Sequence, residues 1–215
     1  MTVPEFLFDG PGDSALTVAL AHGAGALMSS PFMAAFAEGL GAEGYRVARF
    51  EFPYMAERRR TGKKKPPDRA PVLLETWRAV VGALGPANLV IGGKSLGGRV
   101  ASQVVHEMEA ARGGLPGIAG LVCLGYPFHA PGKPASDERL RHLAALSTPT
   151  LICQGTRDTL GNAADVQGYE LSPAVSVHWL EDGDHGFKPR KASGLTEADN
   201  WENAIEAVAQ FLRGL

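Results

Sequence analysis

The sequence predicts an α/β protein whose central, mostly parallel sheet of about seven strands carries helices on both faces. Short apolar runs alternate with longer amphipathic stretches along the 215 residues. The middle runs, such as TVALA, NLVIGG and GLVCLG, are almost continuously apolar. Strands have this composition when helices cover both faces of a parallel sheet. The alternation therefore indicates right-handed β–α–β units, and the length fits one domain, residues 1–215.

The same patterns give the expected elements. Strands are predicted at about 4–8, 15–21, 46–52, 87–92, 118–125, 149–154 and 175–180. Helices are expected to begin at Pro31 and Pro71, and to cover about 96–112 and 135–146. The last helix begins at Thr196, which forms a capping-box-like pair with Asp199. The longest stretch without a predicted element, 53–70, is long enough to be functional.

Composition excludes several classes of protein. The 21 basic and 23 acidic residues give a net charge of −2, which offers no general attraction for nucleic acid or anionic membranes. No apolar run approaches the roughly 18 residues that span a bilayer, and the first residues do not resemble a signal peptide. We therefore expect a cytoplasmic protein, in which Cys123 and Cys153 are free, buried thiols rather than a disulfide.

Six basic residues gather within the unassigned stretch 53–70. They are Arg58, Arg59, Arg60, Lys63, Lys64 and Lys65. A solvated loop explains them, and a patch that steers an anionic substrate or partner is the functional alternative.

The segment GKSLG at 93–97 is the strongest chemical signal in the chain. It is a G-x-S-x-G pattern that follows a predicted strand and precedes a predicted helix. In a nucleophile elbow the serine occupies a strained strand-to-helix turn, and the residues two before and two after it are small because neighbouring segments pass close by. A glycine-rich loop with an incidental serine is the alternative. We expect Ser95 to be a nucleophile.

Two nucleotide-binding patterns compete for these glycines. The letters GKS at 93–95 resemble the end of a P-loop, but Asn88 stands where its first glycine is required. The letters HGAG at 22–25 follow a strand and Glu51 ends the next one, as in a dinucleotide fold. Met28 stands there in place of the third small residue. Both patterns are incomplete, so no nucleotide cofactor is expected.

A nucleophilic serine needs a base, and the base needs an acid that orients it. Hydrolases built on this elbow place the three residues in the chain order serine, acid, histidine. Asp158 follows the strand at 149–154, and His185 lies between the last strand and the last helix. Both are expected at the carboxyl edge of the sheet beside Ser95. A turn-forming aspartate and a solvated histidine are the alternatives.

The backbone amides of Leu96 and Ala24 are the expected oxyanion hole. Such hydrolases use the amide that follows the nucleophile and another from a loop after an earlier strand. Gly25 is the second candidate in that loop, and His22 is expected to hold the loop in place. Asp182 and Asp184 beside His185 resemble a metal site, but no second histidine at helical spacing supports it, so no metal is expected.

Six segments resemble, in the expected order, the α/β-hydrolase fold superfamily. They are LAHGAGA (20–26), FEFPYM (50–55), GGKSLGGRVAS (92–102), LGYPFHAPGKP (124–134), QGTRD (154–158) and DGDHGFK (182–188). More narrowly, the chain resembles small, lid-poor dienelactone-hydrolase-like proteins and the testis-expressed/KANSL-type α/β-hydrolase-like family. The resemblance implies Ser95 as nucleophile, His185 as base and Asp158 as acid. It departs from the full fold in having about seven strands where that fold has eight, and one helix but no cap domain between Tyr126 and Thr150.

Together these patterns predict a serine hydrolase that cleaves a small to medium acyl ester or thioester through an acyl-enzyme, without a cofactor. A non-catalytic interaction protein on the same scaffold is the alternative, because fold alone does not imply activity. Residues near the serine in the predicted topology are expected to contact a small-molecule substrate. These are the apolar walls Tyr54, Met55, Tyr126, Phe128 and Phe187, and the anion contact Arg157.

Overall fold

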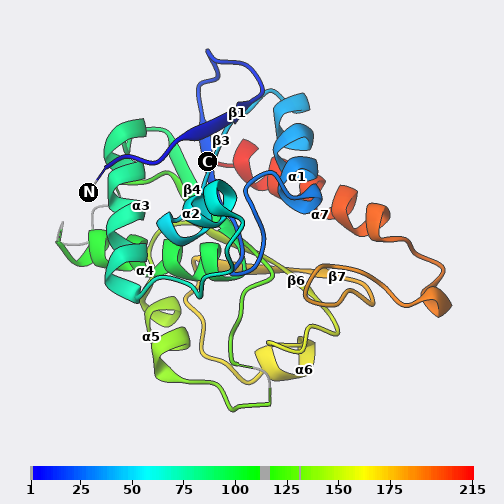
Figure 1. Cartoon of the computed structure of the whole chain (residues 1–215). Helices are drawn as coiled ribbons and strands as arrows, with labels where there is room; N and C mark the ends of the chain where they lie inside the picture. Colours follow the sequence, from blue (N-terminus) through cyan, green and yellow to red (C-terminus); the bar gives the residue numbers. More distant parts are fainter. Residues whose placement is uncertain (1, 112–116, 131) are drawn as a thin grey trace.

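The computed structural model describes residues 2–111, 117–130 and 132–215 (Figure 1). Its described residues form a seven-stranded sheet with the order β1-β3-β2-β4-β5-β6-β7. All neighbours run parallel except β1, which pairs antiparallel with β3 at one edge. The strands are β1 Phe6–Asp9, β2 Thr17–Ala21, β3 Arg46–Phe50, β4 Leu89–Lys94, β5 Gly120–Leu124, β6 Thr150–Gly155 and β7 Val175–Leu180. The predicted α/β class and mostly parallel sheet are confirmed.

Helices cover both faces of this sheet, as predicted. The longer ones are α1 Pro31–Ala42, α3 Ala70–Leu84, α4 Leu96–Ala111, α5 Asp137–Ala145 and α7 Glu197–Arg213. Side chains that alternate along β2 show the two layers, because successive residues of a strand point to opposite faces. Ala19 and Ala21 join the core under α3 and α4, whereas Val18 and Leu20 join the core under α1 and α7. Figure 1 shows α1 and α7 together, apart from α3 and α4.

The stretch 53–70, for which no element was predicted, begins with helix α2, Pro53–Thr61. Pro53 occupies the first turn, where its missing N–H is not needed, and Gly62 ends the helix with a left-handed φ of 71°. Only Tyr54 and Met55 of this helix are buried. The apolar stripe that marks most helices is therefore missing, which explains why the sequence pattern did not reveal it. The short helix α6, Ala163–Val166, and the 3-10 turn Lys191–Ser193 were missed for their brevity.

Three of the six basic residues on and just after α2 form ion pairs or hydrogen bonds with other parts of the chain. Arg59 forms ion pairs with the buried Glu51 and with Glu5. Lys65 pairs with Glu57, and Arg58 Nη1 donates to a loop carbonyl at 3.3 Å. Arg59 thus links α2 to residues that flank β1 and β3, Arg58 links it to the loop after β2, and the Lys65 pair stays within the segment 53–70. The remaining basic side chains, Arg60, Lys63 and Lys64, are exposed, and their steering role stays a prediction.

Other local predictions also have clear outcomes. Cys123 and Cys153 are free and buried, and burial raises the pKa of both thiols. The predicted capping box between Thr196 and Asp199 is present at the start of α7. Between β5 and β6 the described residues form the single helix α5. No helix in the described ranges is long and apolar enough to cross a membrane.

One buried histidine, His142, links α5 to the core. His142 Nε2 lies 2.8 Å from Ser102 Oγ and 3.3 Å from Tyr126 Oη. Both hydroxyls donate to backbone carbonyl groups, so Nε2 carries the proton that His142 donates. Burial lowers the pKa of His142 to about 4, and electrostatic interactions with the neighbouring His106 and Arg99 add to this shift. The folded protein therefore holds this ring neutral.

We predict that His142→Gln flattens the acid dependence of stability. The folded-state pKa lies below the unfolded value, so the contribution is complete above about pH 6.5 and is lost as pH falls toward 4. The wild type should lose about 3 kcal/mol of unfolding free energy over this window from this group. Gln keeps an N–H donor but does not titrate. Urea denaturation at several pH values measures the difference.

His178→Gln is the matched control, because that histidine bonds the Asn203 side chain near the surface and has no comparable burial. It should follow the wild-type curve. Equal acid losses in wild type and His142→Gln would contradict the assignment.

Candidate active site

Ser95 sits at the sharp turn between β4 and α4 in a strained backbone conformation. Its φ is +51°, a region that residues with a side chain seldom adopt. A Cβ at Gly93 would lie 2.1 Å from the Ala21 carbonyl oxygen, and one at Gly97 would lie 2.5 Å from the same atom. Glycine is therefore required two residues before and two residues after the serine, because the end of β2 passes against this turn. Ser95 N also donates to Leu124 O at 3.0 Å, which attaches the turn to β5.

The structure brings Ser95, His185 and Asp158 into one line of hydrogen bonds. His185 Nε2 lies 2.9 Å from Ser95 Oγ, and its Nδ1 lies 2.8 Å from Asp158 Oδ2. The three residues follow β4, β7 and β6, whose carboxyl ends share one edge of the sheet. A carboxylate only accepts hydrogen bonds, so Nδ1 carries the proton and Nε2 is left as the acceptor for the serine hydroxyl. This tautomer is the one that can remove a proton from Oγ.

Asp158 is fully buried and held by groups other than the histidine. Its Oδ1 accepts from Leu160 N at 2.8 Å, and Oδ2 accepts from Gln154 Nε2 at 2.9 Å. Gln154 is itself buried, and its Oε1 accepts from Tyr126 N at 2.7 Å. Sequence reasoning gave Gln154 no role. The available signal was a polar residue at the end of an otherwise apolar strand, where burial demands partners.

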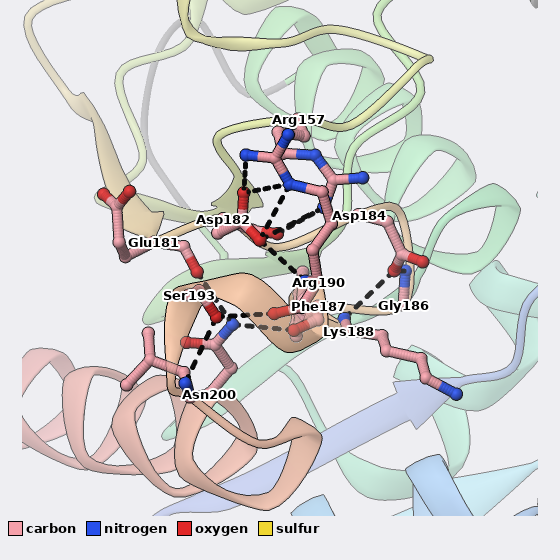
Figure 2. Close-up of polar contacts among 11 residues, drawn as sticks. Arg157, Glu181, Asp182, Asp184, Gly186, Phe187, Lys188, Arg190, Ser193 and Asn200 are labelled. Atoms are coloured by element: carbon pink, nitrogen blue, oxygen red, sulfur yellow. Dashed lines mark hydrogen bonds and ion pairs between the residues drawn. The ribbon is translucent and has the colours of Figure 1, made fainter.

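The loop that carries His185 is held through its backbone carbonyl groups. All the carbonyl groups of residues 181–188 accept a hydrogen bond. Loop amides and Arg157 bind those of residues 182, 183, 184 and 188. Asn200 and Trp201 of α7 bind those of residues 181, 186 and 187, and Figure 2 shows the Asn200 contacts. The remaining carbonyl, that of His185, accepts from Lys94 Nζ.

Asp182 closes this loop at its base. Its carboxylate accepts from Arg190 N at 2.6 Å and from Arg190 Nε at 2.8 Å (Figure 2). The Arg190 guanidinium holds the pKa of this carboxyl below its usual range. Asp182 and Phe187 have positive φ values of 52° and 72°, conformations that persist only where surrounding contacts fix them. Arg157, predicted as an anion contact, donates to Asp182 O at 2.7 Å and helps to shape the loop.

The loop after β2 is fixed through its carbonyl groups. His22 Nδ1 donates to Gly23 O at 2.7 Å, and its Nε2 accepts from Phe52 N at 3.1 Å. Tyr54 Oη donates to Ala24 O at 3.0 Å. The N–H of a trans peptide points opposite to its carbonyl, so these bonds leave the amides of residues 24 and 25 on the other side of the loop. Burial lowers the pKa of His22, and the neutral ring fits the holding role that was predicted.

The predicted apolar walls are part of the packed interior. Tyr54, Met55, Tyr126, Phe128 and Phe187 have no solvent exposure. They therefore offer no surface to a substrate in this structure, which corrects the sequence-based expectation. Their hydrophobicity draws them beneath the site, where Tyr54 and Phe187 brace the two loops around Ser95.

A cavity of about 540 Å³ lies beside the loop after β2. It is lined by Gly25, Leu27, Ser29, Ser30, Pro31, Arg58, Arg59 and Gly62. Gly23 of the same loop lies close to the serine, because a Cβ at Gly23 would lie 3.8 Å from Ser95 Cβ. The residues that line the cavity do not include Gly23, Ser95, His185 or Asp158. Sequence reasoning did not place a cavity between α1 and α2.

The acidic residues near His185 already have partners. Asp182 binds Arg190, and Asp184 Oδ1 accepts from the amides of Gly186 and Lys188. Within the described ranges there is no group of three or more His, Cys, Asp or Glu residues placed to hold a metal ion.

Comparison with known proteins supports the fold. A family model described as an alpha/beta hydrolase domain matches residues 14–213. An alpha-beta serine hydrolase homologue from Coxiella burnetii shares 16% identity at a TM-score of 0.67, covering 98% of this chain and 90% of its own. An α/β serine hydrolase without a lid from Xanthomonas campestris shares 20% identity at a TM-score of 0.62, and the match covers 96% of this chain and 88% of that protein. A monoacylglycerol lipase from Paleococcus ferrophilus shares 14% identity at a TM-score of 0.71, and the match covers 98% of this chain and 100% of that protein.

We predict that Gln154→Met destabilises the protein through the acid side of this site. The substitution keeps the side-chain volume but leaves the buried Tyr126 N–H without its partner, and it removes the Gln154 hydrogen bond from Asp158 Oδ2, which then keeps only His185. An unsatisfied buried group costs about 1–3 kcal/mol, so the unfolding free energy should fall by that amount. Urea denaturation measures it. Gln210→Met, at an exposed position of α7, is the control, and equal losses in both variants would refute the proposed bracing of Asp158.

Proposed function

The chain belongs to the α/β-hydrolase family, and we propose that it is a serine hydrolase that cleaves a small to medium acyl ester or thioester. The observation that carries the proposal is the line of hydrogen bonds from Ser95 Oγ through the His185 ring to the buried Asp158 carboxylate. A serine hydroxyl is a weak nucleophile until a positioned base accepts its proton. The structural relatives described as a serine hydrolase and a lipase are consistent with this chemistry.

The proposed reaction has two halves. Ser95 Oγ attacks the acyl carbonyl while His185 Nε2 accepts its proton, and Asp158 stabilises the imidazolium that forms. His185 then returns the proton to the leaving alkoxide or thiolate, which leaves the acyl group on Ser95. Water attacks this acyl-enzyme with His185 again as base, and the acid product and free serine result. Base catalysis of this kind contributes about 10²–10⁴ in rate.

The amides of Leu96 and Ala24 are the proposed oxyanion hole. Leu96 is the first residue of α4, where N–H groups have no partner within the helix and the helix dipole favours negative charge. The bond from His22 to Gly23 O holds the peptide that carries the Ala24 N–H, and the bond from Tyr54 to Ala24 O holds the peptide that carries the Gly25 N–H, the second candidate donor. Each such donor is worth about 10²–10³ in rate.

Two features support a substrate of modest size. The cavity of about 540 Å³ beside the Gly23–Gly25 loop is within the usual range of about 300–1,000 Å³ for small-molecule sites. The single helix α5 between β5 and β6 leaves the described part of that connection without the bulk of a lid. We place the acyl or leaving group of the proposed substrate in this cavity, beside the loop whose Gly23 lies close to Ser95.

We predict that a fluorophosphonate probe labels Ser95, and that esters of graded acyl length are hydrolysed. Ser95→Ala and His185→Gln should lower hydrolysis by about 10⁴-fold or more, because the triad acts as a unit. Ser102→Ala is the matched control, since Ser102 also contacts a histidine but is buried away from the elbow. Peptide mass spectrometry locates the label, and hydrolysis rates rank the esters.

The control should retain labelling and turnover. If folded wild-type protein takes no label and hydrolyses none of the esters, the enzyme proposal fails and the non-catalytic interaction protein is favoured.

A further inference from the structure

Lys94 occupies the variable position immediately before Ser95 in the elbow. It is the last residue of β4, where it pairs with Leu124 of the neighbouring strand. Its side chain passes the loop after β2, because a Cβ at Gly23 would lie 3.4 Å from Lys94 Cγ. Its Nζ then donates to the backbone carbonyl of His185. One side chain therefore touches the loops on both sides of the serine.

The ammonium group of Lys94 lies between two aromatic rings and faces Gly125. Nζ lies 5.3 Å from the centre of the Phe32 ring and 5.5 Å from that of Phe187, distances at which aromatic faces attract a cation. Gly125 faces the same group with a φ of +68°, and a Cβ there would lie 2.5 Å from Nζ and 3.0 Å from the His185 carbonyl oxygen. Only glycine at position 125 leaves room for this contact.

This contact is distinct from all the others that hold the His185 loop. The other carbonyl groups of residues 181–188 bind the loop itself, Arg157 or α7. Among the described residues, Lys94 provides the hydrogen bond from the strand that bears the nucleophile. The acceptor of this hydrogen bond is the carbonyl group of His185 itself, and the donor, Lys94, directly precedes Ser95 in the chain.

We propose that Lys94 is a positioning residue, whose ammonium joins the backbone of His185 to the nucleophile elbow and so keeps Nε2 aligned with Ser95 Oγ. This role rests on the proposed hydrolase function, because alignment matters only if the two side chains react together. Displacements of about 1 Å in such an arrangement can cost about 100-fold in rate.

The surroundings of Nζ make the effect sensitive to pH. The charged and titratable groups that face it are Asp158, from the segment after β6, and Asp184 and His185, from the loop after β7. Helix α1 contributes Phe32 and β5 is followed by Gly125, neither of which is charged. Burial lowers the pKa of Lys94 to about 8, and the two aspartates oppose that shift. The ammonium is therefore present at neutral pH and is lost as pH rises through about 8.

The test is the rate of fluorophosphonate labelling of Ser95 between pH 6 and 10 in wild type, Lys94→Met and Lys188→Met. Lys94→Met should react about 10- to 100-fold more slowly at pH 7 and should lack the decline that the wild type shows above about pH 8. Lys188 is exposed on the same loop, so Lys188→Met controls for charge and should follow the wild type. Thermal melts check that the variants fold.

Phe32→Leu gives a second measurement that does not depend on the folding of Lys94→Met. It removes one aromatic face from the cation, so the alkaline decline should move to lower pH. The positioning role would be overturned if Lys94→Met showed the wild-type labelling rate and pH profile, or if the alkaline decline in Phe32→Leu stayed at the wild-type pH. In either case, labelling of the wild type would still support the hydrolase proposal. An unlabelled wild type instead rejects the hydrolase function.

Discussion

The carbonyl oxygen of Ala21, at the end of β2, lies so close to the β4–α4 turn that it determines which residues, and which backbone conformation, the turn can have. Side chains at Gly93 and Gly97 would collide with it. The turn between these glycines is consequently tight, and Ser95 takes a positive φ. In this conformation Oγ stands at the edge of the sheet, within hydrogen-bond distance of the His185 ring. The same approach places the loop after β2 against the serine, which is the basis for the proposed oxyanion role of Ala24.

Placing a base beside this turn requires a second kind of constraint. His185 lies in a loop, and loops are held only as well as their polar groups are paired. Here the carbonyl groups of residues 181–188 are all bonded, and the strained Asp182 and Phe187 persist within that network. Gln154 donates a hydrogen bond to the Asp158 carboxylate and so holds the acid in place. The ring is thus restrained through its side-chain partners and through its own backbone.

Local patterns in the sequence predicted the fold and the meeting of Ser95, Asp158 and His185, but not the groups that support them. The strands and the elbow follow from apolar runs and glycine spacing, which are short-range signals. Gln154 and Lys94 depend on which loops meet across the sheet, and spacing along the chain does not encode that. Helix α2 lacked an apolar stripe. Tyr126 and Phe128 were expected to contact substrate but are fully buried, because an aromatic residue that is close to a site in sequence can pack in the core below that site.

For the proposed hydrolase, the loops around the serine rather than the fold would select the substrate. The fold is shared with relatives of 14–20% identity whose names include a serine hydrolase and a lipase, and a fold alone does not choose a substrate. The connection from β5 to β6 adds only α5 in its described part. The cavity between α1 and α2 is different, because Arg58 and Arg59 line it beside the proposed oxyanion loop. Arg58 uses one donor on Gly25 O, and a guanidinium has five. We therefore place the proposed recognition of the acyl or leaving group on this side of the site rather than at a lid.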